Sequence, residues 1–146
     1  MVKFSRKKTV ERIIDANINR AKEGLRVCEE IARFILESRS LTADFKLIRH
    51  KIEIILKSFV KNLGLLEKRF SLNDIGRDIY ADELKRKDCQ DIFFANIQRA
   101  KESLRVLEEF SKLKDINTAV RFKKIRYEVY EIEKKAAKRF ASPRYF

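Results

Sequence analysis

The sequence predicts an all-α protein with four long helices in two hairpins that are related by a pseudo-twofold axis and form one bundle. Helix breakers are scarce, with one proline and three glycines in 146 residues, and apolar residues recur at helical spacing. A repeat supports the duplication: the sixteen residues from Ala16 match those from Ala95 at twelve positions, at an offset of 79. A chain of this length builds one core. We therefore expect a single domain, 1–146, with repeat halves at about 9–60 and 88–140.

A weaker repeat follows the first one. The segment FKLIRHKIE begins at Phe45, and FKKIRYEVY begins at Phe122, at an offset of 77. Two repeats in the same order and at nearly the same offset indicate a duplicated pair of helices.

The first half reads as two helices. Thr9 is a good N-cap, and the apolar stripe behind it predicts a helix to about Glu37. The segment from Ser38 to Leu41 breaks this helix, and Thr42 is the expected cap of the second.

An irregular connection is expected from about Lys61 to Asp82, and long connections of this kind are often functional. The third helix is expected to start near Asp82 or Asp88 and to end near Leu113. Asn117 or Thr118 is the expected cap of the fourth helix, which ends before Pro143.

Composition limits the class of protein. The formal net charge of +13 favours contact with phosphate, whether of a nucleic acid, a membrane or a metabolite. No stretch of eighteen apolar residues predicts a membrane span, and the basic N-terminus lacks the apolar region of a secretory signal. Cys28 and Cys89 form neither a disulfide framework nor a metal-binding spacing. These features predict a cytoplasmic protein.

Two amides interrupt the apolar stripes, Asn17 on the first helix and Asn96 at the matching place on the third. A buried amide without partners costs about 1–3 kcal/mol. The two amides therefore either pair across the pseudo-twofold axis and fix the register of the helices, or face a polar pocket and bind a ligand. Both interpretations stay open, and they are compatible.

Small residues form a notch on the same helices. Gly24 and its counterpart Ser103 each follow an alanine by one turn. The notch indicates either a close crossing of the two helices or room for a substrate.

Charged residues at the border of the apolar stripes recur in both copies. Four arginines in such places can converge on a phosphate, because the planar guanidinium binds phosphate through two hydrogen bonds. The alternative is a ladder of exposed ion pairs. The residues concerned are Arg20 and Glu23, repeated as Arg99 and Glu102, together with Arg49 and Arg126. His50 and Cys28 are more simply a solvent-facing or packed side chain and a core residue.

The residues from Asp15 to Val27, DANINRAKEGLRV, closely resemble the DANLNRAREGLRV signature of the small all-helical hydroxymethylpyrimidine-phosphate kinases of thiamin biosynthesis. Leu47–His50 is similar to the LRH element of that family and Asn73–Gly76 to its DVG loop. The second copy from Ala95 and the ending at Arg126-Tyr127 also match. The resemblance covers about residues 9–134. The family also occurs as the N-terminal domain of chains that end in a thiamin-phosphate synthase barrel.

The resemblance implies a kinase that uses ATP and Mg²⁺ to phosphorylate hydroxymethylpyrimidine monophosphate to the diphosphate. It implies that Arg20, Glu23, Arg99 and Glu102 are catalytic, and that Asn17, Asn96, Arg49, Arg126, Asp74 and Gly76 bind substrate. Glu23, Glu102 and Asp74 are candidates for contact with Mg²⁺ or for orienting the attacking phosphate, and the metal ligands are not assigned.

Two alternatives belong to other classes. One is a basic helical module that binds nucleic acid, which the dispersal of basic among acidic residues disfavours. The other is a non-catalytic partner of thiamin-phosphate synthase. The sequence leaves open whether the chain forms a homo-oligomer and whether one or both pseudo-symmetric sites work.

Overall fold

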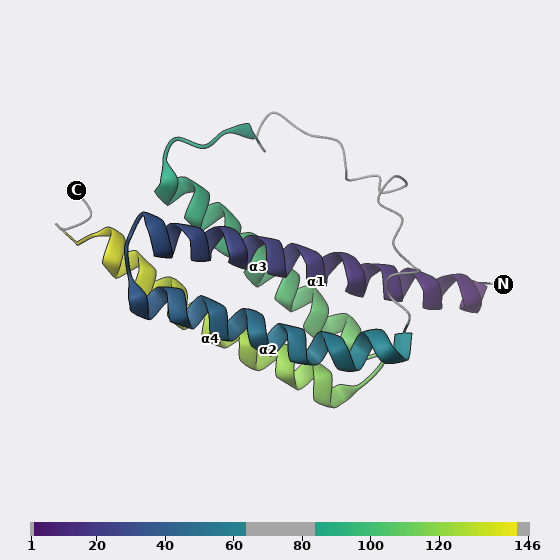
Figure 1. Ribbon diagram of the computed structural model, residues 1–146. Helices are drawn as coiled ribbons and strands as arrows, with labels where there is room; N and C mark the ends of the chain where they lie inside the picture. The colour runs from purple at the N-terminus through teal and green to yellow at the C-terminus, as the bar shows by residue number, and fades with distance from the viewer. Residues whose placement is uncertain (1, 64–83, 143–146) are drawn as a thin grey trace.

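The computed structural model describes residues 2–63 and 84–142, which hold four helices: α1 (Val2–Phe34), α2 (Arg39–Leu63), α3 (Cys89–Ser111) and α4 (Ile116–Phe140). These ranges contain no strand. The prediction of an all-α fold is confirmed. Figure 1 shows α1 crossing α3 while α2 runs beside α4. Each helix packs on two others, α1 on α2 and α3, and α4 on α2 and α3. The single-domain boundaries stay a prediction.

One core lies between the four helices. Phe93 on α3 is fully buried, and its ring meets that of Phe45 on α2 edge to face, with centroids 5.9 Å apart. Phe140 on α4 meets the same ring at 5.3 Å. At the other end of the core Phe59 and Phe122 stack. Aromatic side chains thus join the two hairpins.

The pseudo-twofold relation is visible in contacts. Lys51 and Glu128 occupy equivalent positions of the two copies, and the Lys51 ammonium donates to the Glu128 carboxylate at 2.8 Å. Two equivalent residues that touch lie on opposite sides of the symmetry axis. The axis therefore passes between α2 and α4 at this pair.

The first hairpin departs from the expected boundaries. Helix α1 begins at Val2 because no proline or glycine interrupts the residues before Thr9. It ends at Phe34, where Glu37 takes a left-handed backbone (φ 49°) and the Ser38 N–H donates to the Ala32 carbonyl. The Ser38 hydroxyl accepts from the Leu41 N–H at 3.2 Å, so Ser38 caps α2 in place of Thr42.

The second hairpin is capped by aspartates. Asp88 accepts from the Asp91 N–H and starts α3, as one of the two expected positions. Asp115 starts α4 in place of Asn117 or Thr118, since its carboxylate accepts from the backbone of Asn117 and the hydroxyl of Thr118. The Thr118 hydroxyl also lowers the pKa of Asp115.

The expected connection is shorter than predicted on one side, because α2 continues to Leu63. Asp74 and Gly76, which were expected to bind substrate, lie outside the described residues. Pro143 does so too.

Helices α1 and α3 cross at the small-residue notch. A Cβ atom on Gly24 would lie 2.7 Å from the Asn96 carbonyl oxygen and 3.6 Å from the Ala100 Cβ. One turn further on, the Cys28 thiol donates to the Phe93 carbonyl at 3.5 Å. The prediction of a close crossing is confirmed, and the backbone of α3 fills the notch.

Candidate functional site

Arg49 lies in an ion-pair cluster around a buried carboxylate. Glu29 on α1 is fully buried, and its Oε1 accepts from Arg49 Nε on α2 at 2.7 Å. Its Oε2 accepts from Arg33 Nη2 at 2.9 Å. Burying a carboxylate is costly unless its charge is paired, so the two guanidiniums stabilise the junction of α1 and α2.

Arg126 lies in the equivalent cluster of the second copy. Glu108 on α3 is also buried, and its Oε1 accepts from Arg126 Nη2 at 3.0 Å. Its Oε2 accepts from Arg105 Nη1 at 2.7 Å. Arg126 Nη1 donates to the Tyr130 hydroxyl at 2.9 Å. The positive charge of Arg126 is thus neutralised by a buried carboxylate of the protein itself.

The two clusters lie at opposite ends of the bundle. Glu29 is next to Cys28, which touches Phe93 on α3. Glu108 lies fifteen residues beyond Phe93 along the same helix, which corresponds to about 22 Å at 1.5 Å per residue. The structure therefore does not bring Arg49 and Arg126 together, and the four arginines do not converge on one point.

Arg20 and Arg99 lie at the crossing of α1 and α3. Arg20 is one turn before Gly24, which meets α3, and Arg99 is one turn before Ser103, the equivalent position of the second copy. Arg20 is half-buried and Arg99 is exposed. Neither has a hydrogen-bond or ion-pair partner within residues 2–63 and 84–142.

Asn17 and Asn96 lie beside these arginines, three residues earlier on each helix. The Asn17 amide donates to the Ile13 carbonyl at 2.8 Å, and the Asn96 amide donates to the Ile92 carbonyl at 2.8 Å. The interpretation that the two amides pair with each other is wrong, because no hydrogen bond joins them in the described residues and each donates instead to the carbonyl one turn earlier in its own helix. The crossing thus groups two amides and two arginines.

Glu23 and Glu102 are exposed, and Glu102 accepts from Gln98 at 3.0 Å. In the part of the chain that the structure describes, no group of three His, Cys, Asp or Glu side chains is placed to hold a metal ion. Contact of these glutamates with Mg²⁺ stays a prediction.

The two remaining residues that the sequence singled out, His50 and Cys28, lie where they were expected. His50 is solvent-facing, and Cys28 is a core residue, as expected. Burial raises the pKa of the Cys28 thiol far above its usual value, and the charge of Glu133 adds to the shift. A thiol held in its neutral form is a poor nucleophile.

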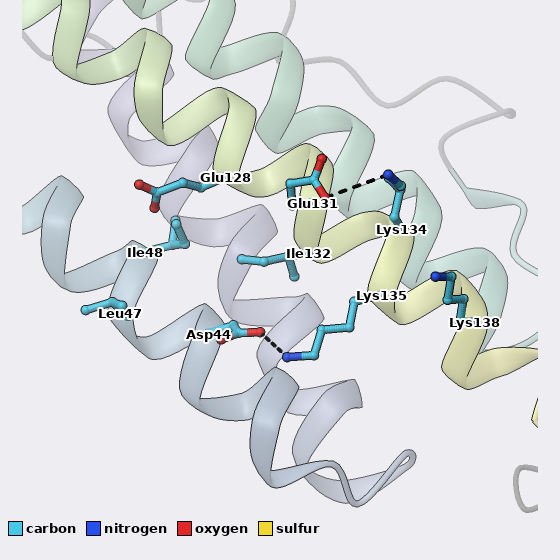
Figure 2. Close-up of a pocket in the computed structure, with 9 residues that line it drawn as sticks. All are labelled: Asp44, Leu47, Ile48, Glu128, Glu131, Ile132, Lys134, Lys135 and Lys138. Atoms are coloured by element: carbon cyan, nitrogen blue, oxygen red, sulfur yellow. Dashed lines mark hydrogen bonds and ion pairs between the residues drawn. The ribbon is translucent and has the colours of Figure 1, made fainter.

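A groove of about 490 Å³ runs between α2 and α4, and it contains none of the residues that were expected to form the site. Figure 2 shows Asp44 and Leu47 on the α2 wall, with Lys135 from α4 reaching across to the Asp44 carboxylate at 2.7 Å. The lining residues are Asp44, Leu47, Ile48, Glu128, Glu131, Ile132, Lys134, Lys135 and Lys138.

Sequence reasoning missed the two carboxylates that organise the arginines, Glu29 and Glu108. Their signal was present, because a pair of adjacent glutamates recurs in both copies of the repeat. It also missed Asp15, which is buried within the signature segment and makes an interaction, whereas its counterpart in the second copy is Phe94. The copies therefore differ beside the crossing.

Comparison with known proteins adds the family. The model of the ThiD2 family matches residues 12–135. The chain belongs to the ThiD2 family. Three relatives, each named thiamine-phosphate synthase, come from Synechocystis sp. (40% identical over 125 residues), Rhodopirellula baltica (39% over 135) and Nostoc punctiforme (36% over 135). No solved structure matches the chain.

The ThiD2 chain spans only part of these relatives. The matches cover 85%, 89% and 89% of this chain, but 35%, 36% and 37% of the respective relatives. The region is thus about a third of each longer protein.

These relatives correct the functional expectation. A thiamine-phosphate synthase is a transferase that is not a kinase, so the expected phosphorylation of hydroxymethylpyrimidine monophosphate is overturned. Nor do these relatives indicate a nucleic-acid-binding module. The expectation of ATP and Mg²⁺ as cofactors is not tested and stays a prediction. Among the described residues, no helix has an apolar stretch long enough to cross a membrane.

Proposed function

We propose that this ThiD2 chain takes part in the formation of thiamine phosphate, by holding a pyrimidine phosphate at the α1–α3 crossing for a thiamine-phosphate synthase. The observation that carries the proposal is the pair Arg20 and Arg99, two equivalent arginines without an acidic partner in the described ranges. A guanidinium presents two parallel N–H donors to a phosphate. The relatives are named thiamine-phosphate synthase, and the reaction in this proposal is taken from that name.

The amides beside the arginines suit the other end of such a ligand. One side-chain N–H of Asn17 and one of Asn96 are used within their own helices, and the oxygen of each amide is an acceptor of hydrogen bonds. A ring amine is a donor that this oxygen can bind. The arginines would thus hold the phosphate, and the amides would orient the ring.

The names of the relatives support a role for this region beside a thiamine-phosphate synthase. The chain matches about a third of each of two relatives that are named thiamine-phosphate synthase, which supports a helical region that works together with a synthase. We propose that the helical part presents the pyrimidine phosphate and that a synthase, in the same cytoplasmic compartment, carries out the transfer.

The experiment measures thiamine phosphate formed by the synthase of the same organism, with and without this chain, at limiting pyrimidine phosphate. We expect the chain to raise the rate, and Arg20→Ala to abolish the increase. The matched control is Arg121→Ala, an exposed arginine on α4, which should behave as wild type. Equal rates with and without the chain, together with no calorimetric binding of the pyrimidine phosphate, would overturn the proposal.

A further inference from the structure

We propose that Arg20 and Arg99 form one clamp on the pseudo-twofold axis and bind a single, doubly charged phosphate monoester per chain. This inference rests on the site of the proposed function. It goes further by assigning the stoichiometry and the charge of the ligand, and it proposes that the two equivalent half-sites act as one.

The register of α1 and α3 places the axis at the arginines. Gly24 on α1 lies beside Asn96 and Ala100 on α3. By the twofold relation, Ser103 takes the matching place beside residues 17–21. The axis lies midway between these contacts, at about residues 20–22 of α1 and 99–101 of α3. Arg20 and Arg99 therefore start from neighbouring points on the two sides of the axis.

The close crossing keeps the arginines near each other. A Cβ on Gly24 has no room against the α3 backbone, so the helices approach more closely than ordinary side chains allow. Figure 1 shows the crossing of α1 over α3 near the middle of both helices. Arg20 and Arg99 each lie one turn before a small residue of the notch, at equivalent positions of the repeat. We infer that their side chains extend from the crossing on the same side.

The electrostatics of this pair differ from those of the other arginines beside the core. Arg26, Arg33, Arg49, Arg105 and Arg126 each have a glutamate within 4.0 Å. Arg20 and Arg99 have no such partner in the described part of the chain. Two like charges at one crossing repel each other, and a dianion between them removes the repulsion. One monoester dianion neutralises both guanidiniums, whereas two separate anions would bring new repulsion.

The test is a titration followed by NMR on the side-chain Nε–H signals of Arg20 and Arg99, with methyl phosphate as the probe. We expect both signals to shift with the same Kd. In Arg20→Ala, we expect the Arg99 signal to lose affinity at least about tenfold, since each guanidinium supplies hydrogen bonds to a charged group. Arg99→Ala should affect Arg20 in the same way, and Arg121→Ala should change neither.

The charge of the ligand has its own control. Methyl phosphate is a dianion above its second pKa, about 6, whereas dimethyl phosphate carries one charge throughout. Arginine stays charged at all accessible pH. We therefore expect methyl phosphate to bind more weakly at pH 5.0 than at pH 7.5, and dimethyl phosphate to bind weakly at both.

Independent titration of Arg99 in Arg20→Ala, with unchanged Kd, would mean two separate sites and would overturn the clamp. Equal binding of the two esters would overturn the assignment of a dianion, and absence of any shift would overturn both. A clamp that binds methyl phosphate in a chain that leaves thiamine phosphate formation unchanged would contradict the proposed function alone.

Discussion

The arginines at the α1–α3 crossing differ from those at the two hairpin junctions in what neutralises them. Arg49 and Arg126 each donate to a buried carboxylate, at 2.7 Å to Glu29 and 3.0 Å to Glu108. Arg20 and Arg99 border the same core on α1 and α3 without an acidic partner in the described residues. The two arginines of each pair occupy equivalent positions in the two copies of the repeat. The difference is therefore between two kinds of site and not between the two copies.

This contrast shows that an arginine beside a core has no fixed meaning by itself. A buried carboxylate requires a cation, because its desolvation is unfavourable without one. Arginines that meet this requirement stabilise the fold and have little affinity left for a ligand. Arginines without such a carboxylate remain able to bind an anion from solution.

The largest effect is expected from breaking a hairpin junction. Glu29→Ala leaves Arg33 and Arg49 without their shared acceptor and opens a cavity, so we expect a loss of about 3 kcal/mol in the free energy of unfolding. Denaturant unfolding measures it. The control is Glu30→Ala at the half-buried neighbouring position, where the carboxylate pairs with the exposed Arg26 at 3.4 Å, and this variant should stay within about 0.5 kcal/mol of wild type. A similar loss in the free energy of unfolding for both variants would show that the buried Glu29 stabilises the protein no more than Glu30 does.

A smaller effect is expected at the crossing. Gly24→Val places side-chain atoms against the Asn96 carbonyl, and we expect a loss of about 2 kcal/mol in the free energy of unfolding. The shifted helices should also bind methyl phosphate more weakly. Ser103→Ala, at the equivalent position of the second copy, should cost less than about 1 kcal/mol. A valine variant as stable as wild type would mean that the close approach is not required.

The smallest effect concerns acid sensitivity at the second junction. A hydrogen bond from Lys112 lowers the pKa of Glu109, and the charges of Arg105, Lys112 and Arg126 act in the same direction. A lowered pKa in the folded state means that this stabilisation is present above the ordinary value of 4.5 and is lost as the pH falls through the folded value.

We expect Glu109→Gln to flatten the dependence of the unfolding midpoint on pH below about 4.5. Lys112→Met should raise the pKa of Glu109, which a carboxylate NMR titration measures directly. An unchanged titration of Glu109 in Lys112→Met would contradict the assigned cause.

The sequence was sufficient for the fold because the repeat and the helical periodicity depend only on local order along the chain. The ends of the helices were harder to predict from the sequence. Ser38 and Asp115 compete with nearby residues that are equally good caps, and the choice depends on backbone geometry. The start of α1 at Val2 was missed because the absence of a breaker is a weaker signal than a cap.

The sequence predicted only part of the candidate site. Arg20, Arg99, Asn17 and Asn96 were found because they interrupt or border the apolar stripes. The role of Arg49 could not be predicted, since it depends on how α2 packs on α1 and thus on the burial of Glu29. The Asn17 side chain donates to the Ile13 carbonyl within one helical turn. Whether it does so or pairs with Asn96 depends on how α1 packs on α3.

The most direct test of this division of arginines compares Arg20→Ala with Arg126→Ala, by thermal unfolding and by the titration with methyl phosphate. We expect Arg20→Ala to unfold as wild type, within about 0.5 kcal/mol, and to lose the phosphate. We expect Arg126→Ala to lose at least about 1 kcal/mol of stability, because Glu108 loses a charged donor, and to keep the phosphate. Loss of phosphate binding in a folded Arg126→Ala, or an unchanged affinity in Arg20→Ala, would contradict the account.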